Sequence, residues 1–421
     1  MHEQQHIPET GEQNNEMKAT RLATPVIPRP LQSAPRWSVR RRRDAWFLLV
    51  AILLGMLTTF ALSGGGAWLS GQTSLKQLAT SPAQTATNPF TAPSSTTATG
   101  QFHEYPFPQS DSQVMRLVVD HAGRVWFGEM GRNALAVFDP RTHTFQQMTP
   151  PHGRFGMMGM QVAPDDTIWF AEQYANYIGH YFPATGHFQV YPLPRLTIPD
   201  PSHTGKTLTL PSAPNELALD AQGNVWFTEF NAATLGRLDP RTGLIRHYPL
   251  AARRSVQMLL PYGVAVDPQG MIWFTELSTD QVGRLDPVTG RIRFFLVPGS
   301  KVSLMEIASD AHGTIWVTSF EDELLLRLDP RIATFTRYDA SPTGNGTGGL
   351  YGLVVTPAGD VWVTMWADNM LAHLDVTARR FVYYRIPTPG SKPLSMALGP
   401  DQQTLWFNEV DKLGMVQLET G

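Results

Sequence analysis

A short pattern recurs seven times between residues 126 and 406 of this chain: a turn that usually contains glycine, a hydrophobic residue, a tryptophan and further strand-forming residues. Consecutive copies are 43 to 57 residues apart. The tryptophans that anchor them are Trp126, Trp169, Trp226, Trp273, Trp316, Trp362 and Trp406. A repeat of roughly 40–50 residues is typical of β-propeller blades, because one such unit cannot bury its own hydrophobic faces and must stack against neighbours. The spacing predicts seven blades.

Each copy contains four short strands separated by turns. In residues 214–250, NELALD predicts a first strand, NVWFTEF a second, TLGRLD a third and IRHYPL a fourth. Gly223 and Gly243 fall in turns between these strands, where glycine is favoured. We therefore expect an all-β fold, a seven-bladed β-propeller of four-stranded antiparallel blades.

The two ends of the repeat region predict how the ring closes. The last copy, residues 393–418, stops after its third strand, whereas the segment that starts at Gln101 reads QFHEYPFP and resembles the fourth strands of other copies. We expect this N-terminal strand to complete the seventh blade, because closure removes two free sheet edges. The propeller is predicted to occupy residues 101–421 and to be monomeric.

The residues ahead of the propeller predict a single-pass membrane protein. Residues 1–44 are polar and include a run of four arginines at 40–43, and the segment 45–69 starts with eighteen uncharged residues. Such a segment can span a bilayer core of about 30 Å, and its basic flank favours a cytoplasmic N-terminus. We expect a cytoplasmic tail over 1–44, a transmembrane helix over 45–69, a flexible Ser/Thr/Pro/Ala-rich stalk over 70–100 and an extracytoplasmic propeller. A cleaved signal peptide and a secreted propeller are the alternative.

Composition excludes several classes of site. The formal net charge is −3 and the chain has no cysteine, so neither a nucleic-acid-binding field nor a disulfide, a thiolate metal site or a cysteine nucleophile is expected. One interval, from Trp169 to Trp226, contains about a dozen surplus residues centred on 196–210. They predict a long loop between two blades, which either contributes to function or is an insertion without a role.

Two positions of the repeat are candidates for a site, since both fall at the same end of the first two strands of a blade. The position three after the tryptophan holds Glu129, Glu172, Glu229, Glu276, Ser319, Met365 and Glu409. These carboxylates either bind a hard metal ion such as magnesium or hold the blades together through local bonds. The position eleven before the tryptophan holds Met115, Met158, Asn215, Tyr262, Met305, Tyr351 and Ser395. Its tyrosines either form a platform for a flat ligand or pack the channel.

Two copies of the repeat, APNELALDAQGNVWFTEFNAATLGRLDP and PYGVAVDPQGMIWFTELSTDQVGRLDP, resemble the streptogramin B lyase (virginiamycin B lyase) family. The resemblance covers residues 101–421 and implies a seven-bladed propeller that opens cyclic depsipeptides by magnesium-dependent elimination at an ester bond. It also implies a metal ligand at Glu409, and we add Glu276 and Glu229 as further candidate ligands. The family's catalytic histidines lie eleven residues before the last tryptophans, where this chain has Tyr351 and Ser395.

Without those histidines, the candidates for a catalytic base are His152, Tyr262 and Tyr351. A second resemblance, of NELALDAQGNVWFTE to gluconolactonase propellers, implies a metal-dependent hydrolase. Its candidate residues are Asn215, Glu216 and Glu306. The leading hypothesis is a propeller that binds a small molecule, peptide or glycan at the channel mouth, through Asn215, Glu216, Tyr262, Glu306 and Tyr351. The lyase and the hydrolase are the alternatives.

Overall fold

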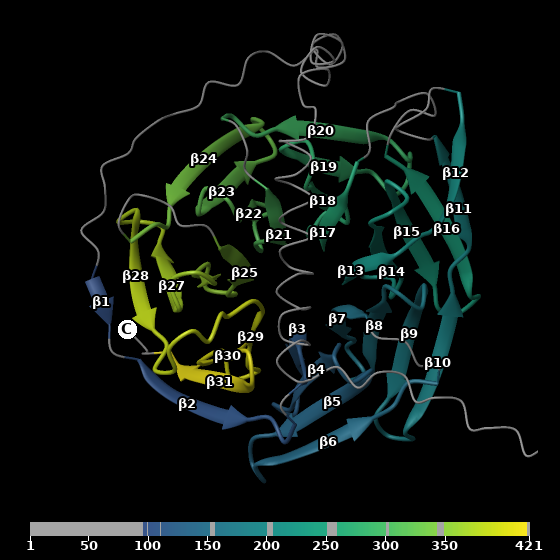
Figure 1. Cartoon of the computed structure of the whole chain (residues 1–421). Helices are drawn as coiled ribbons and strands as arrows, with labels where there is room; N and C mark the ends of the chain where they lie inside the picture. Colours follow the sequence, from purple (N-terminus) through teal and green to yellow (C-terminus); the bar gives the residue numbers. More distant parts are fainter. Residues whose placement is uncertain are drawn as a thin grey trace, which may run out of the picture. The chain divides into compact units, whose positions relative to one another are not determined.

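The structure of the chain is a computed structural model that describes residues 96–98, 100–109, 111–151, 156–199, 205–250, 259–299, 303–342 and 349–418. All of these residues belong to the unit Ala83–Gly421. Seven antiparallel sheets, each built around four strands, are arranged as blades around a common centre (Figure 1). The prediction of an all-β, seven-bladed propeller is confirmed.

Each blade is numbered by its order in the chain and begins with its innermost strand. Blade 1 consists of β3 (Val114–Val119), β4 (Val125–Glu129), β5 (Ala134–Asp139) and β6 (Thr144–Met148). Blade 2 consists of β7 (Met157–Val162), β8 (Ile168–Glu172), β9 (Tyr177–Phe182) and β10 (His187–Pro192). Blade 3 consists of β13 (Pro214–Leu219), β14 (Val225–Glu229), β15 (Thr234–Asp239) and β16 (Leu244–Pro249). Blade 4 consists of β17 (Pro261–Val266), β18 (Ile272–Glu276), β19 (Gln281–Leu285) and β20 (Ile292–Leu296).

The remaining three blades complete the ring. Blade 5 consists of β21 (Leu304–Ser309), β22 (Ile315–Ser319), β23 (Leu324–Asp329) and β24 (Thr334–Asp339). Blade 6 consists of β25 (Leu350–Val355), β26 (Val361–Met365), β27 (Met370–Asp375) and β28 (Arg380–Arg385), with β1 (Thr96–Ala98) added parallel to β28. Blade 7 consists of β29 (Met396–Leu398), β30 (Thr404–Asn408), β31 (Lys412–Gln417) and β2 (Gln101–Pro106), which pairs antiparallel with β31.

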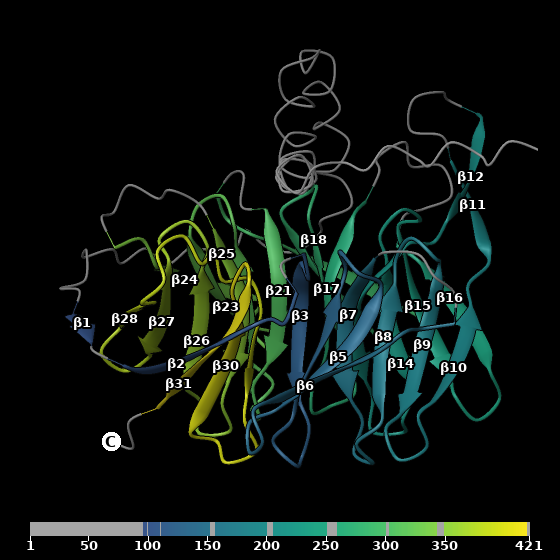
Figure 2. The same ribbon diagram turned by 60° about the horizontal axis from the view of Figure 1, so that its bottom comes forward.

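The surplus residues between blades 2 and 3 form a hairpin instead of an irregular loop. Strands β11 (Arg195–Pro199) and β12 (Thr207–Pro211) pair antiparallel along their length. The hairpin rises from the face of the ring on which the inner strands begin (Figure 2). We call this face the upper face, and the opposite one, with the turns that follow the inner strands, the lower face. The predicted loop is thus ordered by β pairing at its base.

The repeated Asp-x-x-Gly turn holds the tryptophan in place in three of the blades. In blades 1, 3 and 4 the turn aspartate accepts a hydrogen bond from the indole nitrogen, Trp126 to Asp120 at 2.8 Å and Trp226 to Asp220 at 2.9 Å. The same aspartate accepts a backbone N–H four residues on, as in Asn224 to Asp220 at 2.9 Å. In these blades one carboxylate therefore fixes both the turn and the indole ring.

Threonines two residues after the tryptophans join neighbouring blades. The Thr228 hydroxyl accepts the Glu216 N–H of its own blade at 3.0 Å and donates to the Tyr262 carbonyl of the next blade at 2.8 Å. Thr275, Thr318 and Thr364 make the corresponding bonds. In blade 7, Asn408 accepts the Ser395 N–H and donates to the Val114 carbonyl of blade 1 at 2.9 Å. These bonds satisfy inner-strand polar groups that no other strand covers.

The hydrophobic core lies in the seams between blades. Trp273 of blade 4 packs into a cluster formed mainly by blade 5, and Trp406 of blade 7 packs into the cluster of blade 1.

The described residues include no helix long and apolar enough to cross a membrane. The predicted cytoplasmic tail at 1–44 and the predicted anchor at 45–69 lie outside the described residues, and of the predicted stalk only 96–98 and residue 100 are described.

Candidate functional site

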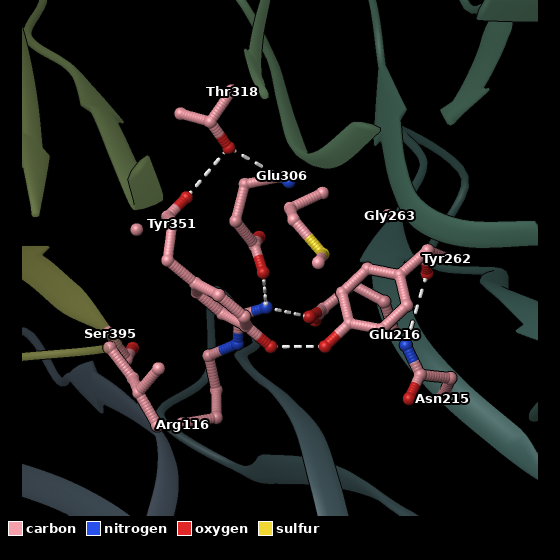
Figure 3. Close-up of polar contacts among 12 residues, drawn as sticks. Arg116, Asn215, Glu216, Tyr262, Gly263, Glu306, Thr318, Tyr351 and Ser395 are labelled. Atoms are coloured by element: carbon pink, nitrogen blue, oxygen red, sulfur yellow. Dashed lines mark hydrogen bonds and ion pairs between the residues drawn. The ribbon is translucent and has the colours of Figure 1, made fainter. Parts of the chain in front are cut away.

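The inner strands place side chains of distant blades in the central channel. In blades 1 to 6 the pairing of the inner strand with the second strand shifts register near its start, for example between Pro214 and Leu217. The two positions within the shift are those ten and eleven residues before the tryptophan. Side chains from blades 1, 3 and 5, which are not neighbours in the ring, meet there (Figure 3).

Charged residues and glycines alternate around this level of the channel. The position ten before the tryptophan holds, from blade 1 to blade 7, Arg116, Gly159, Glu216, Gly263, Glu306, Gly352 and Met396. A Cβ at Gly159 would lie 2.8 Å from Glu216 Oε1, and one at Gly352 would lie 2.4 Å from the Leu394 carbonyl. The glycines thus let adjacent inner strands approach closely and leave room for the charged side chains.

Arg116 bridges the two carboxylates. Its Nη2 contacts both Glu216 and Glu306, and the side chains are 14%, 7% and 8% exposed respectively. Burial raises the pKa of Glu216 to about 7 despite the opposing effect of Arg116. Burial lowers the pKa of Arg116, but the attraction of both carboxylates outweighs it and the pKa lies well above its usual range. The guanidinium is therefore a fixed positive charge in the channel.

Two tyrosines of blades 4 and 6 meet beside this triad. The hydroxyls of Tyr262 and Tyr351 are hydrogen-bonded to each other, and the rings are edge to face with centroids 6.3 Å apart. Burial raises the pKa of both phenols, so both are protonated at neutral pH. Asn215 donates to the Tyr262 carbonyl at 3.2 Å and accepts from Gln173 at 3.3 Å. The five predicted ligand-binding residues are thus brought together (Figure 3).

Above the tyrosines lies an aromatic rim that was not predicted from the sequence. Phe230 lies edge to face with Tyr262 at 6.3 Å, and Phe320 lies likewise with Tyr351 at 6.4 Å. Trp366 packs against Phe320 at 6.1 Å, and the Lys392 ammonium lies 4.5 Å from the Trp366 ring centre. All three rim residues occupy the position four after a repeat tryptophan. That position is aromatic in three of seven copies, a signal that the sequence contains.

Of the glutamates three after the tryptophans, Glu229 and Glu276 make contacts close to their own blades. Glu229 accepts a 2.8 Å bond from His247 of the outermost strand. Glu276 accepts from Ser278, from Thr279 and from a backbone N–H. Glu409 is 1% exposed and its oxygens have no hydrogen-bond partner among the described residues. The structure does not bring these three predicted magnesium ligands together.

No described group of three or more histidine, aspartate or glutamate side chains is placed to hold a metal ion. In the channel, where the hydrolase resemblance placed Asn215, Glu216 and Glu306, the two carboxylates already face the charge of Arg116. Magnesium prefers six oxygen ligands and would be repelled by a guanidinium at this distance. Neither set fits the ion, and its binding stays a prediction.

His152 lies outside the described residues. Ser395 is buried and its hydroxyl accepts the Leu117 N–H at 3.2 Å. Three methionines occupy the same position of the repeat as the two tyrosines: Met115, Met158 and Met305. Of these, Met115 and Met305 are buried. The channel thus holds no described histidine at the positions of the family's base.

Below the triad, the channel widens to a cavity of about 340 Å³. It is lined by residues of all seven inner strands, and Arg116, Glu216 and Glu306 form part of its wall. Tyr262 and Tyr351 do not line it. The aromatic rim and the tyrosine pair therefore lie outside this cavity, and the charged triad forms part of its wall.

Comparison with known families agrees with this fold. The model of the virginiamycin B lyase family matches residues 92–318 and 195–350. The chain belongs to this family. A comparison of the sequence with curated proteins gives no match.

Solved structures share the propeller at low identity. A streptogramin B lyase superposes with a TM-score of 0.66 at 22% identity, over 76% of this chain and 97% of that chain. A catalytically inactive variant of virginiamycin B lyase from Staphylococcus aureus, solved with quinupristin, gives 0.65 at 22% identity over 76% and 99%. The hydrazine synthase of Kuenenia stuttgartiensis gives 0.59 at 12% identity over 75% and 98%. Likeness at this level establishes the fold and leaves the chemistry open.

Proposed function

We propose that this member of the virginiamycin B lyase family is a binding protein whose upper channel mouth holds a small molecule or peptide with an aromatic group and a carbonyl acceptor. The observation that carries the proposal is the pair of protonated phenols beneath an aromatic rim. The hydrogen bond between Tyr262 and Tyr351 uses one phenol proton. No acceptor for the second is found among the described residues, so a ligand carbonyl can take it.

The aromatic rim suits a flat or aromatic group. Phe230, Phe320 and Trp366 present rings around the tyrosines, and edge-to-face packing of such rings adds about 0.5–1.5 kcal/mol per pair beyond burial. Lys392 adds a positive charge at the rim. A peptide ligand can supply both an aromatic side chain and backbone carbonyls. Peptides are therefore the preferred class of ligand in this proposal, and glycans are less favoured.

Catalysis by elimination is the alternative, and the chemistry of the described residues supports it less. A general base works best when its pKa lies near the working pH. Burial moves the pKa of Tyr262 and of Tyr351 away from that range, so these phenols are donors and poor bases. The described carboxylates also do not form a magnesium site. A hydrolase of the gluconolactonase type is supported less for the same reason, since it would also need a metal site that the described carboxylates do not form.

The binding test uses quinupristin as the probe, since a structural relative was solved with it. Ligand-detected NMR with the full-length protein should show binding that Tyr262→Phe/Tyr351→Phe weakens about tenfold, the effect of losing one buried hydrogen bond to a ligand. The matched control is Tyr338→Phe, a buried tyrosine on the outermost strand of blade 5. Equal loss in both variants, or unchanged binding in the double variant, would refute a role for the tyrosine pair.

We also propose that the propeller is extracytoplasmic and held by the anchor at 45–69. The support is the uncharged segment that follows four arginines. In intact cells, a protease added outside should cleave a tag at the C-terminus and spare one at the N-terminus. Protection of both tags would place the propeller in the cytoplasm and overturn the proposal.

A further inference from the structure

The lower face of blades 3 to 5 exposes large aliphatic side chains. Leu244, Val288 and Ile332 are 53%, 90% and 70% exposed. Each lies in, or directly after, the turn between the third and fourth strands of its blade, which is on the lower face because the strands alternate in direction. Two other large hydrophobic residues of the described chain are exposed, Tyr174 and Leu296, and both lie toward the upper face. Three consecutive blades thus present an aliphatic residue at equivalent turns, which differs from the usual scattered exposure.

The same turns are basic. In each blade the turn is covered by the ten residues that begin eleven after the tryptophan. In blades 3 to 5 these are residues 237–246, 284–293 and 327–336, with eight arginines and three aspartates, a net charge of +5. The corresponding residues of blades 1, 2 and 6 have a net charge of +1. The inner turns of blades 3 to 5 add one aspartate each, which leaves +2 on their lower face in a chain of net charge −3.

The aspartates of these turns fix the backbone, and the arginines extend into solvent. Asp239 and Asp329 accept the backbone N–H groups of Arg241 and Arg331 at 3.0 Å. The side chains of these arginines are 82% and 84% exposed. Arg291 of the blade 4 turn is exposed as well. Protruding aliphatic side chains flanked by guanidinium groups suit a bilayer with anionic headgroups, where the former enter the acyl boundary and the latter contact phosphates.

The propeller is also entered from the lower face. Gln101, the first residue of β2, pairs with Gln417 at the lower end of β31. The 31 residues 70–100 separate it from the segment 45–69, the anchor proposed above. A tether that joins the ring at the lower face lets this face lie on the bilayer. The upper mouth, the proposed binding site, is then directed away from the membrane.

We propose that the lower face of blades 3 to 5 docks on a lipid bilayer that contains anionic headgroups. Leu244, Val288 and Ile332 insert into the headgroup boundary, and the arginines around them contact lipid phosphates. The proposal rests on the proposed anchor, which brings the propeller to the bilayer. Docking then fixes the orientation of the ring.

The test places a fluorescent label at single cysteines, since the chain has none of its own. Val288→Cys carries the label at the lower face. Leu296→Cys is the matched control, because Leu296 is 60% exposed at the upper end of the outermost strand of the same blade. The full-length protein is placed in nanodiscs of phosphatidylcholine and phosphatidylglycerol with a nitroxide-labelled lipid as quencher. We expect at least about twofold stronger quenching at residue 288 than at residue 296.

Three results would overturn the proposal. The first two are equal quenching at the two positions and no quenching at residue 288. The third is a label at residue 288 that is shielded from aqueous iodide but not quenched by the lipid, which would indicate a protein partner or a second copy of the chain. Co-purification of the protein with the nanodiscs tests the anchor separately. A protein that co-purifies without quenching at residue 288 is anchored and not docked.

The apolar part of the surface is tested by Leu244→Ser/Ile332→Ser in the protein labelled at residue 288. Both side chains are exposed, so the fold should tolerate the changes. Quenching should fall about twofold, because two of the three inserted groups are lost. Leu296→Ser is the control and should leave the quenching unchanged. Equal effects of the lower-face and the control variants would refute insertion of these residues.

The basic part is tested by Arg241→Gln/Arg291→Gln with the same label. Quenching should fall about twofold in nanodiscs with phosphatidylglycerol and stay unchanged in nanodiscs of phosphatidylcholine alone. The matched control is Arg141→Gln/Arg380→Gln, two arginines that are 69% and 47% exposed near the equivalent turns of blades 1 and 6. If the control lowered the quenching as much, the charge of blades 3 to 5 would not direct the docking.

Discussion

The seams between blades repeat one arrangement around the ring, whereas the residues that face the channel change from blade to blade. Four blades use the same threonine to join an inner-strand N–H to the carbonyl of the next blade. In the channel, Arg116 of blade 1 is matched by glycine or glutamate at the equivalent positions of blades 2 to 6. The repeated residues hold the ring together, and the residues that break the repeat form the candidate site.

The comparison also shows how a repeated residue can lose its partner. Glu129 and Glu229 bond to Gln147 and His247 on the outermost strands of their blades. In blade 2 the corresponding position is Val190, which pairs with Gly179 as His247 pairs with Gly236. Valine offers no hydrogen-bond donor, so both oxygens of Glu172 lack a partner among the described residues, although the side chain is 0% exposed. The repeat fixes the glutamate but not its partner.

The largest predicted effect is on the channel. Arg116→Met leaves Glu216 and Glu306 without their cation, and breaking a buried ion pair costs about 3–5 kcal/mol. Urea unfolding followed by tryptophan fluorescence should show a loss of this size. The control is Arg141→Met, whose side chain is 69% exposed beside Asp139, so its loss should leave the free energy of unfolding nearly unchanged. Similar losses for the two variants would contradict the charged triad.

A smaller loss is expected in the seams. Thr318→Val leaves the Glu306 N–H and the Tyr351 carbonyl without their shared hydroxyl, which should cost about 1–3 kcal/mol. Thr197→Val removes an exposed bond to Thr209 in the β11–β12 hairpin and should change the free energy of unfolding by less than about 0.5 kcal/mol. If the hairpin variant lost as much as the seam variant, the threonine bridges would not be what joins the blades.

A further prediction concerns the dependence of stability on pH. Burial raises the pKa of Glu172 to about 8, from about 4.3 in an unfolded chain. The folded state thus favours the protonated acid, and the stability that Glu172 contributes falls as the pH rises from about 4.5 to about 8. Glu172→Gln should reduce the difference between the free energies of unfolding at pH 5 and pH 8. Part of the difference should remain, since burial and the nearby Glu104 also raise the pKa of Glu409 to about 8. An unchanged difference would mean that Glu172 is not protonated in the folded protein.

The fold followed from the sequence because the residues that build it recur. The tryptophan, the Asp-x-x-Gly turn and the Trp-Phe-Thr-Glu strand each have a structural role that repeats with the blade. The direction of the glutamates did not follow, because neighbours in a strand point to opposite sides. Thr228 reaches the next blade while Glu229 bonds within its own. Spacing alone does not tell these two sides apart.

The site was predicted in part. The channel position of Asn215, Tyr262 and Tyr351 followed from the alignment of the copies, since equivalent inner-strand positions meet in the centre of a ring. The role of Arg116 did not follow, because its partners lie 100 and 190 residues away, in blades that are not its neighbours. The alternation of charged residues with glycines around the ring was present in the sequence and would have indicated that three side chains share the centre.

The most direct test of the account is the fate of quinupristin on the full-length protein, with and without magnesium. Liquid chromatography separates the cyclic compound from a linear elimination product of the same mass, and ultraviolet absorbance detects the new double bond. The account predicts a bound and intact cyclic compound under both conditions, since the described part of the channel presents protonated phenols and an arginine. A linear product that forms only with magnesium would contradict it and establish the protein as a lyase.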